Sequence, residues 1–179
     1  MHSAFTSPTP TTQNFLICFA DFSSFYRSCL KLEDRTIYEL MDEYFILQES
    51  ILAKSDGTVI KVIGDASLIL FPEESASQGI STLLELKQRS DEYMEDKGLK
   101  CKLILKIHFG EAVIGHLQGI NPKRPDVYGK NINHTAVMRS FGISLSPQAF
   151  RKLNPEQRKS FKKHTPPVRY IPGYEPHQD

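Results

Sequence analysis

Apolar residues along the chain alternate between short runs and helical repeats, and this pattern predicts the order of the elements. Structure is expected to begin at Asn14, because the apolar run 14–20 is typical of a buried strand that ends at Asp21. Apolar positions then recur every three or four residues over 33–53, and again over 73–96. This spacing indicates two amphipathic helices.

Runs rich in β-branched residues predict paired strands between and after these helices. The runs 58–64 and 66–71 meet at Gly64-Asp65, which predicts a hairpin with an acid at its tip. The segments 101–110 and 111–119 are expected to form a second hairpin. Later signals are a helix over 131–140, a strand over 143–146, a helix that begins at Pro147 with Ser146 as N-cap, a basic solvated helix face over 151–163 and a strand over 168–171.

This order of elements predicts one α+β domain over residues 14–179, with a mostly antiparallel sheet covered by helices. A chain of 179 residues is long enough to bury one sizeable core but not two. Residues 1–13 are rich in Ser, Thr and Pro without a hydrophobic period, which is typical of a disordered segment.

Composition narrows the classes of function. The 22 basic and 21 acidic residues nearly balance, so the charge of the whole chain favours neither nucleic acid nor an anionic membrane as a partner. No stretch approaches the roughly 20 apolar residues of a membrane-spanning helix. The three cysteines and six histidines lack the spacing of a disulfide framework or a zinc site. We therefore expect a cytoplasmic protein with reduced thiols and no zinc.

Two acids follow or join predicted strands. Asp21 comes after the first strand and Asp65 lies at the hairpin tip. Carboxylates on neighbouring strand ends can share hard cations, since Mg²⁺ usually takes one or two carboxylates together with phosphate oxygens of a substrate. Spacing alone favours a simpler interpretation, in which Asp65 suits its turn and Asp21 ends a strand.

Four longer motifs favour the metal site over this simpler interpretation. The stretches FADFSSF (19–25) and KVIGDASLILF (61–71) resemble the two metal motifs of class III adenylate and guanylate cyclases. KIHFGEAVIG (106–115) resembles their central hairpin, and DVYGKNIN (126–133) resembles their base and ribose contacts. The resemblance implies a ferredoxin-like βαββαβ core extended into the cyclase fold. It also implies a head-to-tail homodimer whose subunits together complete each site.

The resemblance assigns phosphate and metal contacts by position. It implies that Asp21 and Asp65 hold two Mg²⁺ or Mn²⁺ ions, which would help to activate the ribose 3′-hydroxyl of ATP and neutralise the α-phosphate as pyrophosphate leaves. Backbone amides would cradle the phosphates if they open a helix. The residues concerned are Phe22, Ser23, Ser24 and Phe25.

Lys61 and Asp126 occupy the positions of the family's base-selecting pair. An ammonium that donates to adenine N1 and a carboxylate that accepts from the N6 amino group are complementary to adenine. Guanine offers the opposite polarity, which would leave buried groups unpaired at a cost of roughly 1–3 kcal/mol each. The resemblance thus implies ATP, while a solvated strand lysine and a loop acid are the simpler alternatives.

Three further positions bear on catalysis. Asn133 matches the asparagine that orients the ribose, although such a residue can instead cap a helix. Four residues on, the family carries an arginine that stabilises charge on the α-phosphate, and this chain has Val137. Arg139 is not expected to replace it, because a helix turns ~100° per residue and position 139 would point about 200° away. Lys163, beside Lys162, matches a late lysine that reaches the triphosphate.

The sequence therefore supports two hypotheses. The first is a signalling adenylate cyclase that converts ATP to cyclic AMP as a homodimer, weakened by Val137 because losing one transition-state donor typically costs about 10²–10³ in rate. The second is a catalytically silent cyclase-homology domain that dimerises and binds nucleotide.

Overall fold

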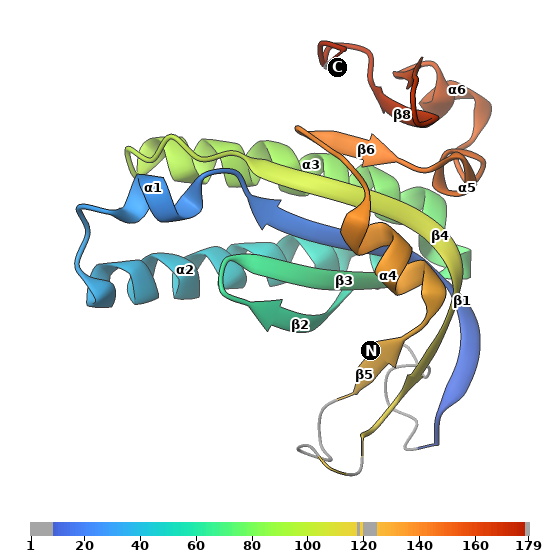
Figure 1. Ribbon diagram of the computed structural model, residues 1–179, viewed down its shortest axis with the longest axis horizontal. Helices are drawn as coiled ribbons and strands as arrows, with labels where there is room; N and C mark the ends of the chain where they lie inside the picture. Colours follow the sequence, from blue (N-terminus) through green and yellow to red (C-terminus); the bar gives the residue numbers. More distant parts are fainter. Residues whose placement is uncertain (1–8, 118, 120–124, 178–179) are drawn as a thin grey trace.

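The computed structural model describes residues 9–117, 119 and 125–177, and its fold is α+β (Figure 1). The strands are β1 Thr11–Phe22, β2 Thr58–Ile63, β3 Ala66–Pro72, β4 Leu103–Gly115, β5 Asp126–Tyr128, β6 Ile143–Leu145, β7 Phe161–His164 and β8 Arg169–Pro172. The α-helices are α1 Phe25–Cys29, α2 Asp34–Leu52, α3 Ala76–Asp96, α4 Lys130–Val137, α5 Pro147–Phe150 and α6 Pro155–Arg158. Short 3-10 turns cover Ala53–Ser55 and Glu73–Ser75.

All the strands belong to one sheet in the order β2-β3-β1-β4-β6-β8-β7, with β5 paired to β4. The long strands β1 and β4 pair from Thr11 opposite Ile114 to Phe22 opposite Leu103. The pair β4–β6 is parallel, and the other recorded pairs are antiparallel. The predicted fold class, a mostly antiparallel sheet covered by helices, is confirmed.

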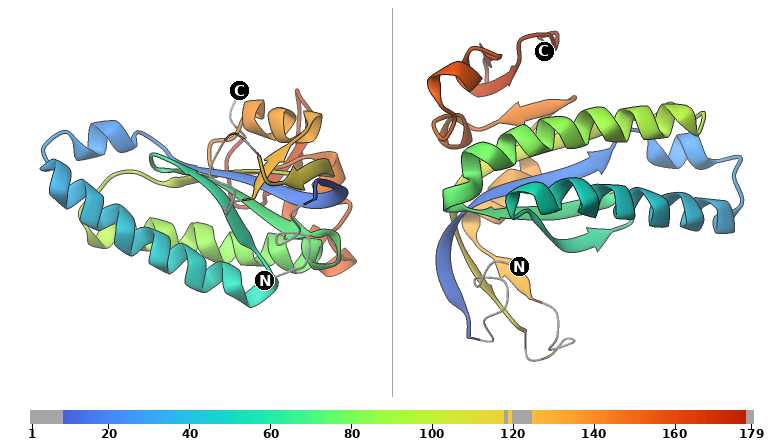
Figure 2. Two further views of the ribbon diagram at one scale, coloured as in Figure 1. Left: turned by 90° about the horizontal axis from the view of Figure 1, so that it is seen from below. Right: turned by 180° about the vertical axis from the view of Figure 1, so that it is seen from behind.

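Different helices pack on the two faces of the sheet (Figure 2). Helices α2 and α3 pack on one face, where Leu16 and Cys18 of β1 enter the main core. The alternate residues Phe15 and Ile17 enter a second cluster that includes Ile132 of α4. Because strand side chains alternate between faces, Asp21 lies on the same face as this second cluster. The α4 face is therefore the one that carries the candidate chemistry.

The predicted amphipathic helices are confirmed as α2 and α3. Leu40, Tyr44 and Ile51 of α2 are buried against the sheet, and each fully buried apolar side chain of this size stabilises the fold by about 1.5–3 kcal/mol. Ser146 caps α5 by accepting a hydrogen bond from the Ala149 amide, with Pro147 at the first helical position, as expected. Among the described helices, none has the length and apolarity needed to cross a bilayer.

The prediction of a second hairpin, formed by 101–110 and 111–119, is wrong. Residues Leu103–Gly115 form a single strand that stays paired with β1 across the supposed turn. Gly110 serves a different purpose, because a Cβ atom there would lie 2.5 Å from Cγ of Asn131. Glycine thus allows α4 to approach β4.

Three boundaries also differ from expectation. Strand β1 begins at Thr11 rather than Asn14, since Thr11 already pairs with β4, and residues 1–8 lie outside the described part of the chain. Helix α4 ends at Val137, because Met138 has an extended backbone with ψ of 142°. The segment 151–163 is not one helix but a turn, the short α6 and β7.

Candidate functional site

The acids Asp21 and Asp65 lie side by side at one end of the sheet. The β2–β3 hairpin forms as predicted, with Gly64 in the left-handed conformation at φ 63°, and brings Asp65 to the end of β1. There the Phe22 amide donates to Oδ2 of Asp65 at 3.3 Å. Burial and then the charge of Asp65 raise the pKa of the Asp21 carboxyl, while Lys106 opposes the shift.

This arrangement suits a divalent cation. Two carboxylates that repel each other in a partly desolvated place gain stability when a cation is shared between them. In the described part of the chain, His, Cys, Asp and Glu side chains do not gather in a potential metal group of three or more. The donor set is thus two carboxylates, which is what Mg²⁺ takes when water and phosphate oxygens complete its coordination.

Lys61 and Asp126 form an ion pair on the same face of the sheet. Their Nζ and Oδ1 atoms are 2.6 Å apart. Asp126 also accepts from its neighbouring Val127 amide at 2.7 Å and from the Tyr128 hydroxyl at 3.1 Å. Burial alone would lower the pKa of Lys61, but the hydrogen bond and charge of Asp126 raise it above its usual value. The pair therefore presents an ammonium and a carboxylate next to each other.

Two irregular features bring this pair together. The register of β2 against β3 shifts between Val59 and Lys61, so Lys61 lies opposite Leu68, whose side chain belongs to the second cluster. Strands β1 and β4 also curve along their length, which carries β5 and Asp126 toward β2 (Figure 1). No periodic signal in the sequence marks either feature.

Helix α4 presents Asn133 and Val137 on one side, one turn apart. The helix is anchored by Asn131, whose Nδ2 donates to the Glu111 carbonyl at 2.8 Å and whose Oδ1 lies 3.0 Å from Nε2 of His108. Asn133 is exposed, and Val137 is 78% exposed. The side of α4 that carries these two residues therefore faces outward.

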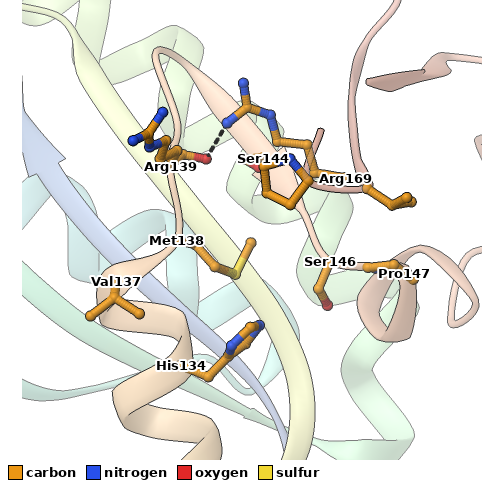
Figure 3. Close-up of a pocket in the computed structure, with 10 residues that line it drawn as sticks. His134, Val137, Met138, Arg139, Ser144, Ser146, Pro147 and Arg169 are labelled. Atoms are coloured by element: carbon orange, nitrogen blue, oxygen red, sulfur yellow. Dashed lines mark hydrogen bonds between the residues drawn. The ribbon is translucent and has the colours of Figure 1, made fainter. Parts of the chain in front are cut away.

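The prediction that Arg139 points away from Val137 assumed a helix that continues through residue 139, and α4 ends before it. Because α4 ends at Val137 and Met138 is extended, the rotation of 100° per residue does not apply to Arg139. Arg139 lies in the segment after the helix and lines the same cavity as Val137 (Figure 3).

The four amides proposed to bind phosphate are differently placed. Phe22 ends β1, and the Ser23 amide already donates to the Lys102 carbonyl at 2.9 Å. Ser24 is the N-cap of α1 in the left-handed conformation at φ 55°, and Phe25 is the first helical residue. The chain does turn into a helix here, but two of the four amides already have acceptors.

Lys163 is far from these groups within one chain. It is exposed on β7, at the edge of the sheet, where it lies opposite Tyr170. Four strand steps separate β1 from β7, on the order of 20 Å, which exceeds the reach of a lysine side chain. Among the described residues, no hydrogen bond or ion pair joins the Asp21–Asp65 pair to the Lys61–Asp126 pair.

Solved structures of nucleotide cyclases share this fold. The adenylyl cyclase CyaB from P. aeruginosa is 16% identical with a TM-score of 0.74, covering 87% of this chain and 86% of its own. The guanylyl cyclase Cya2 is 17% identical with a TM-score of 0.74, covering 89% and 91%. A bacterial light-regulated adenylyl cyclase is 18% identical with a TM-score of 0.78, and the match covers 93% of this chain and 55% of that one.

A comparison with curated protein sequences gives no match. The family model of the adenylate and guanylate cyclase catalytic domain matches residues 8–172, which is most of the chain. On that match, and in agreement with the shared fold, the chain belongs to the adenylate and guanylate cyclase catalytic domain family.

Proposed function

We propose that this chain is an adenylate cyclase that converts ATP to cyclic AMP and pyrophosphate at a homodimer interface. The observation that carries the choice of ATP is the ion pair of Lys61 with Asp126 at 2.6 Å. Adenine presents an acceptor at N1 beside a donor at N6, and the ammonium and carboxylate offer the matching donor and acceptor side by side. Guanine would set acceptor against carboxylate and donor against ammonium, leaving both groups unpaired.

Asp21 and Asp65 are the proposed ligands of two Mg²⁺ or Mn²⁺ ions. Burial and then the charge of Asp65 raise the pKa of Asp21, and a cation held between the two carboxylates would offset both of these costs of ionisation. Bound divalent ions would supply Lewis-acid stabilisation of the reacting phosphate and hydroxyl oxygens. The protein's part is to hold the two carboxylates adjacent, so that a bound cation would favour their ionised forms.

Other side chains and backbone amides of this chain would bind and orient the nucleotide. Asn133 is exposed on α4 and would donate to or accept from the ribose, which fixes the 3′-hydroxyl relative to the α-phosphate. The amides of Ser24 and Phe25, at the start of α1, would face phosphate oxygens. Lys163 would reach the triphosphate from β7.

A homodimer follows if these residues serve one nucleotide. Because Lys163 lies on the order of 20 Å from the strand that carries Asp21, one chain does not bring both to the same triphosphate. The hairpin tip and the end of α4 also expose large apolar side chains, as an interface would: Val62, Ile63, Val137 and Phe141. We further propose a cytoplasmic signalling role, in keeping with three buried free cysteines.

The test is a paired assay of purified protein with ATP and with GTP, each with Mn²⁺ and with Mg²⁺, in which cyclic AMP and cyclic GMP are measured by mass spectrometry. We expect cyclic AMP from ATP and little cyclic GMP from GTP. Equal production from both nucleotides would refute the role of the Lys61–Asp126 pair. A dimer mass by light scattering accompanies the assay.

A second candidate function is favoured by Val137. The position where the family carries a transition-state arginine here bears an exposed aliphatic side chain, so a silent domain that dimerises and binds nucleotide is the alternative. ATP binding by calorimetry, without cyclic product at high enzyme concentration, would select this alternative over the enzyme.

A further inference from the structure

Tyr128 contacts both members of the Lys61–Asp126 pair. Asp126 and Tyr128 are two residues apart on β5, and because strand side chains alternate between faces, both project from the same side of this strand. Strand β5 pairs with the end of β4 and lies near β2, the strand that carries Lys61 (Figure 1). Tyr128 therefore stands beside the pair, although the resemblance to the family assigned it no role.

The Tyr128 hydroxyl limits how Asp126 can accept further hydrogen bonds. It donates to Oδ2 of Asp126 at 3.1 Å. The other oxygen, Oδ1, lies 2.6 Å from Nζ of Lys61 and accepts from the Val127 amide at 2.7 Å. A carboxylate has about four lone-pair positions, two on each oxygen. Because two donors already face Oδ1, the position left for a donor from a ligand is on Oδ2.

The Tyr128 ring contacts the other member of the pair. Nζ of Lys61 lies over this ring, 4.9 Å from its centroid, which is within the range of a cation–π interaction. The side chains of Lys61 and Asp126 are 34% and 14% exposed, so both are open to a ligand. The ring and the carboxylate together restrict where the ammonium of Lys61 lies, and a group that is already ordered loses less conformational freedom when a ligand binds.

Packing in the core does not explain these contacts. Tyr128 is 53% exposed, whereas Val127 on the opposite side of β5 is buried in the second cluster. The attachment of β5 to the fold therefore depends on Val127 rather than on Tyr128. Substitutions at an exposed position such as Tyr128 usually change stability little, so they test the Lys61–Asp126 pair without disturbing the sheet.

We propose that Tyr128 determines the base specificity of the candidate site by holding Oδ2 of Asp126 and the ammonium of Lys61 in one arrangement. This inference rests on the proposed reading of adenine by the Lys61–Asp126 pair. In this arrangement the ammonium donates to adenine N1, and the open position on Oδ2 accepts from the N6 amino group. The hydroxyl donates to Oδ2 and is therefore not offered to O6 of guanine. Tyr128 is thus a positioning residue, which acts through Lys61 and Asp126.

The probes are the 3′-deoxy forms of ATP and GTP, with Mn²⁺, because a nucleotide without the 3′-hydroxyl cannot cyclise. Calorimetry on the intact protein gives both dissociation constants, and their ratio measures the base preference. Tyr128→Phe removes the hydroxyl and keeps the ring. We expect it to raise the Kd of 3′-deoxy-ATP about three- to tenfold and to change that of 3′-deoxy-GTP less than about twofold. The matched control Tyr38→Phe, at an exposed tyrosine of α2, should change neither.

Tyr128→Leu also removes the ring beneath Lys61 and should lower the adenine preference further, with Tyr38→Leu as its control. A wild type that prefers the adenine nucleotide, with the same preference in both Tyr128 variants, would overturn the role of Tyr128 alone. A wild type without preference would overturn this role together with base reading by the Lys61–Asp126 pair. A preference raised in Tyr128→Phe would also contradict the proposal, because the hydroxyl would then serve guanine.

A double-mutant cycle separates positioning from direct contact with the base. In Asp126→Ala the carboxylate that the hydroxyl orients is absent, so adding Tyr128→Phe should change the ratio of the two dissociation constants less than about twofold. A change as large as in the wild-type background would show that the hydroxyl acts on the base itself and would refute positioning. In the cyclase assay, Tyr128→Phe should raise the KM for ATP with little change in kcat, because the base contacts are equal in the ground and transition states. A lower kcat at unchanged KM would count against the proposal.

Discussion

Val137→Arg is the perturbation with the largest expected gain. In the family pattern an arginine stands here, four residues after the asparagine that orients the ribose. The structure places Val137 at the last residue of α4, one turn from Asn133, with 78% of its surface exposed. An arginine at this position therefore has room, and its guanidinium would extend from the same side of the helix as Asn133.

The magnitudes follow from this exposure. A substitution at so open a position changes the free energy of unfolding by about 0.5 kcal/mol or less, which is a melting-temperature change of about 2 °C or less for a chain of this size. One added donor to the charge that develops on the α-phosphate should raise turnover by roughly 10–10³-fold, or about 1.4–4 kcal/mol. The KM for ATP should change little, because the interaction strengthens mainly in the transition state.

The assay measures the initial rate of cyclic AMP formation, together with dimer mass and melting temperature. The control Val137→Gln adds length and polarity without charge and should gain far less. If Val137→Arg is folded, dimeric and able to bind ATP but no faster than the wild type, the missing arginine is not the limiting defect.

Four further outcomes are expected. Asp21→Asn removes one of two repelling carboxylates, so the metal-free protein should keep its melting temperature while Mn²⁺-dependent stabilisation and turnover are lost; an unchanged Mn²⁺-dependent shift would contradict the metal assignment. Burial and then the charge of Asp65 raise the pKa of Asp21, so the protonated carboxyl stabilises the metal-free fold at low pH, and this stabilisation is lost as pH rises through the raised pKa. Stabilisation by Mn²⁺, measured by thermal unfolding, should therefore increase over that pH range. The double variant Lys61→Glu with Asp126→Lys keeps an ion pair with reversed polarity and should shift the kcat/KM ratio toward GTP by about 30-fold or more; a retained ATP preference would refute base reading by this pair. Mixing Asp21→Ala with Asn133→Ala should restore activity at one of two sites, and verified heterodimers without activity would indicate that each site lies within one chain.

Much of the fold could be predicted because its signals are local. The three- and four-residue spacing of α2 and α3 reflects one face of each helix packing on the sheet, and their bounds agree with expectation to within a few residues. The failure at β4 is tertiary in origin. Gly110 is required by the approach of Asn131 from a distant helix, and its sequence neighbourhood does not distinguish that need from a turn.

The site was predictable in part for the same reason. Asp65 could be placed beside the end of β1 because a hairpin and a neighbouring strand suffice to bring it there. The contact of Lys61 with Asp126 depends on a register shift in β2 and on the curvature of two long strands, which no local pattern encodes. The roles of these residues, of Asn133 and of Lys163 stay predictions until they are measured.

The end of α4 links the candidate catalytic residue to the rest of the fold. Helix carbonyls near a C-terminus lack partners within the helix and attract cations. Here Nζ of Lys106 on β4 binds the Ala136 carbonyl at 2.8 Å, and Arg169 on β8 binds the Arg139 carbonyl just beyond the helix. These two hydrogen bonds join the end of α4 and the segment that follows it to β4 and β8, the strands on either side of β6.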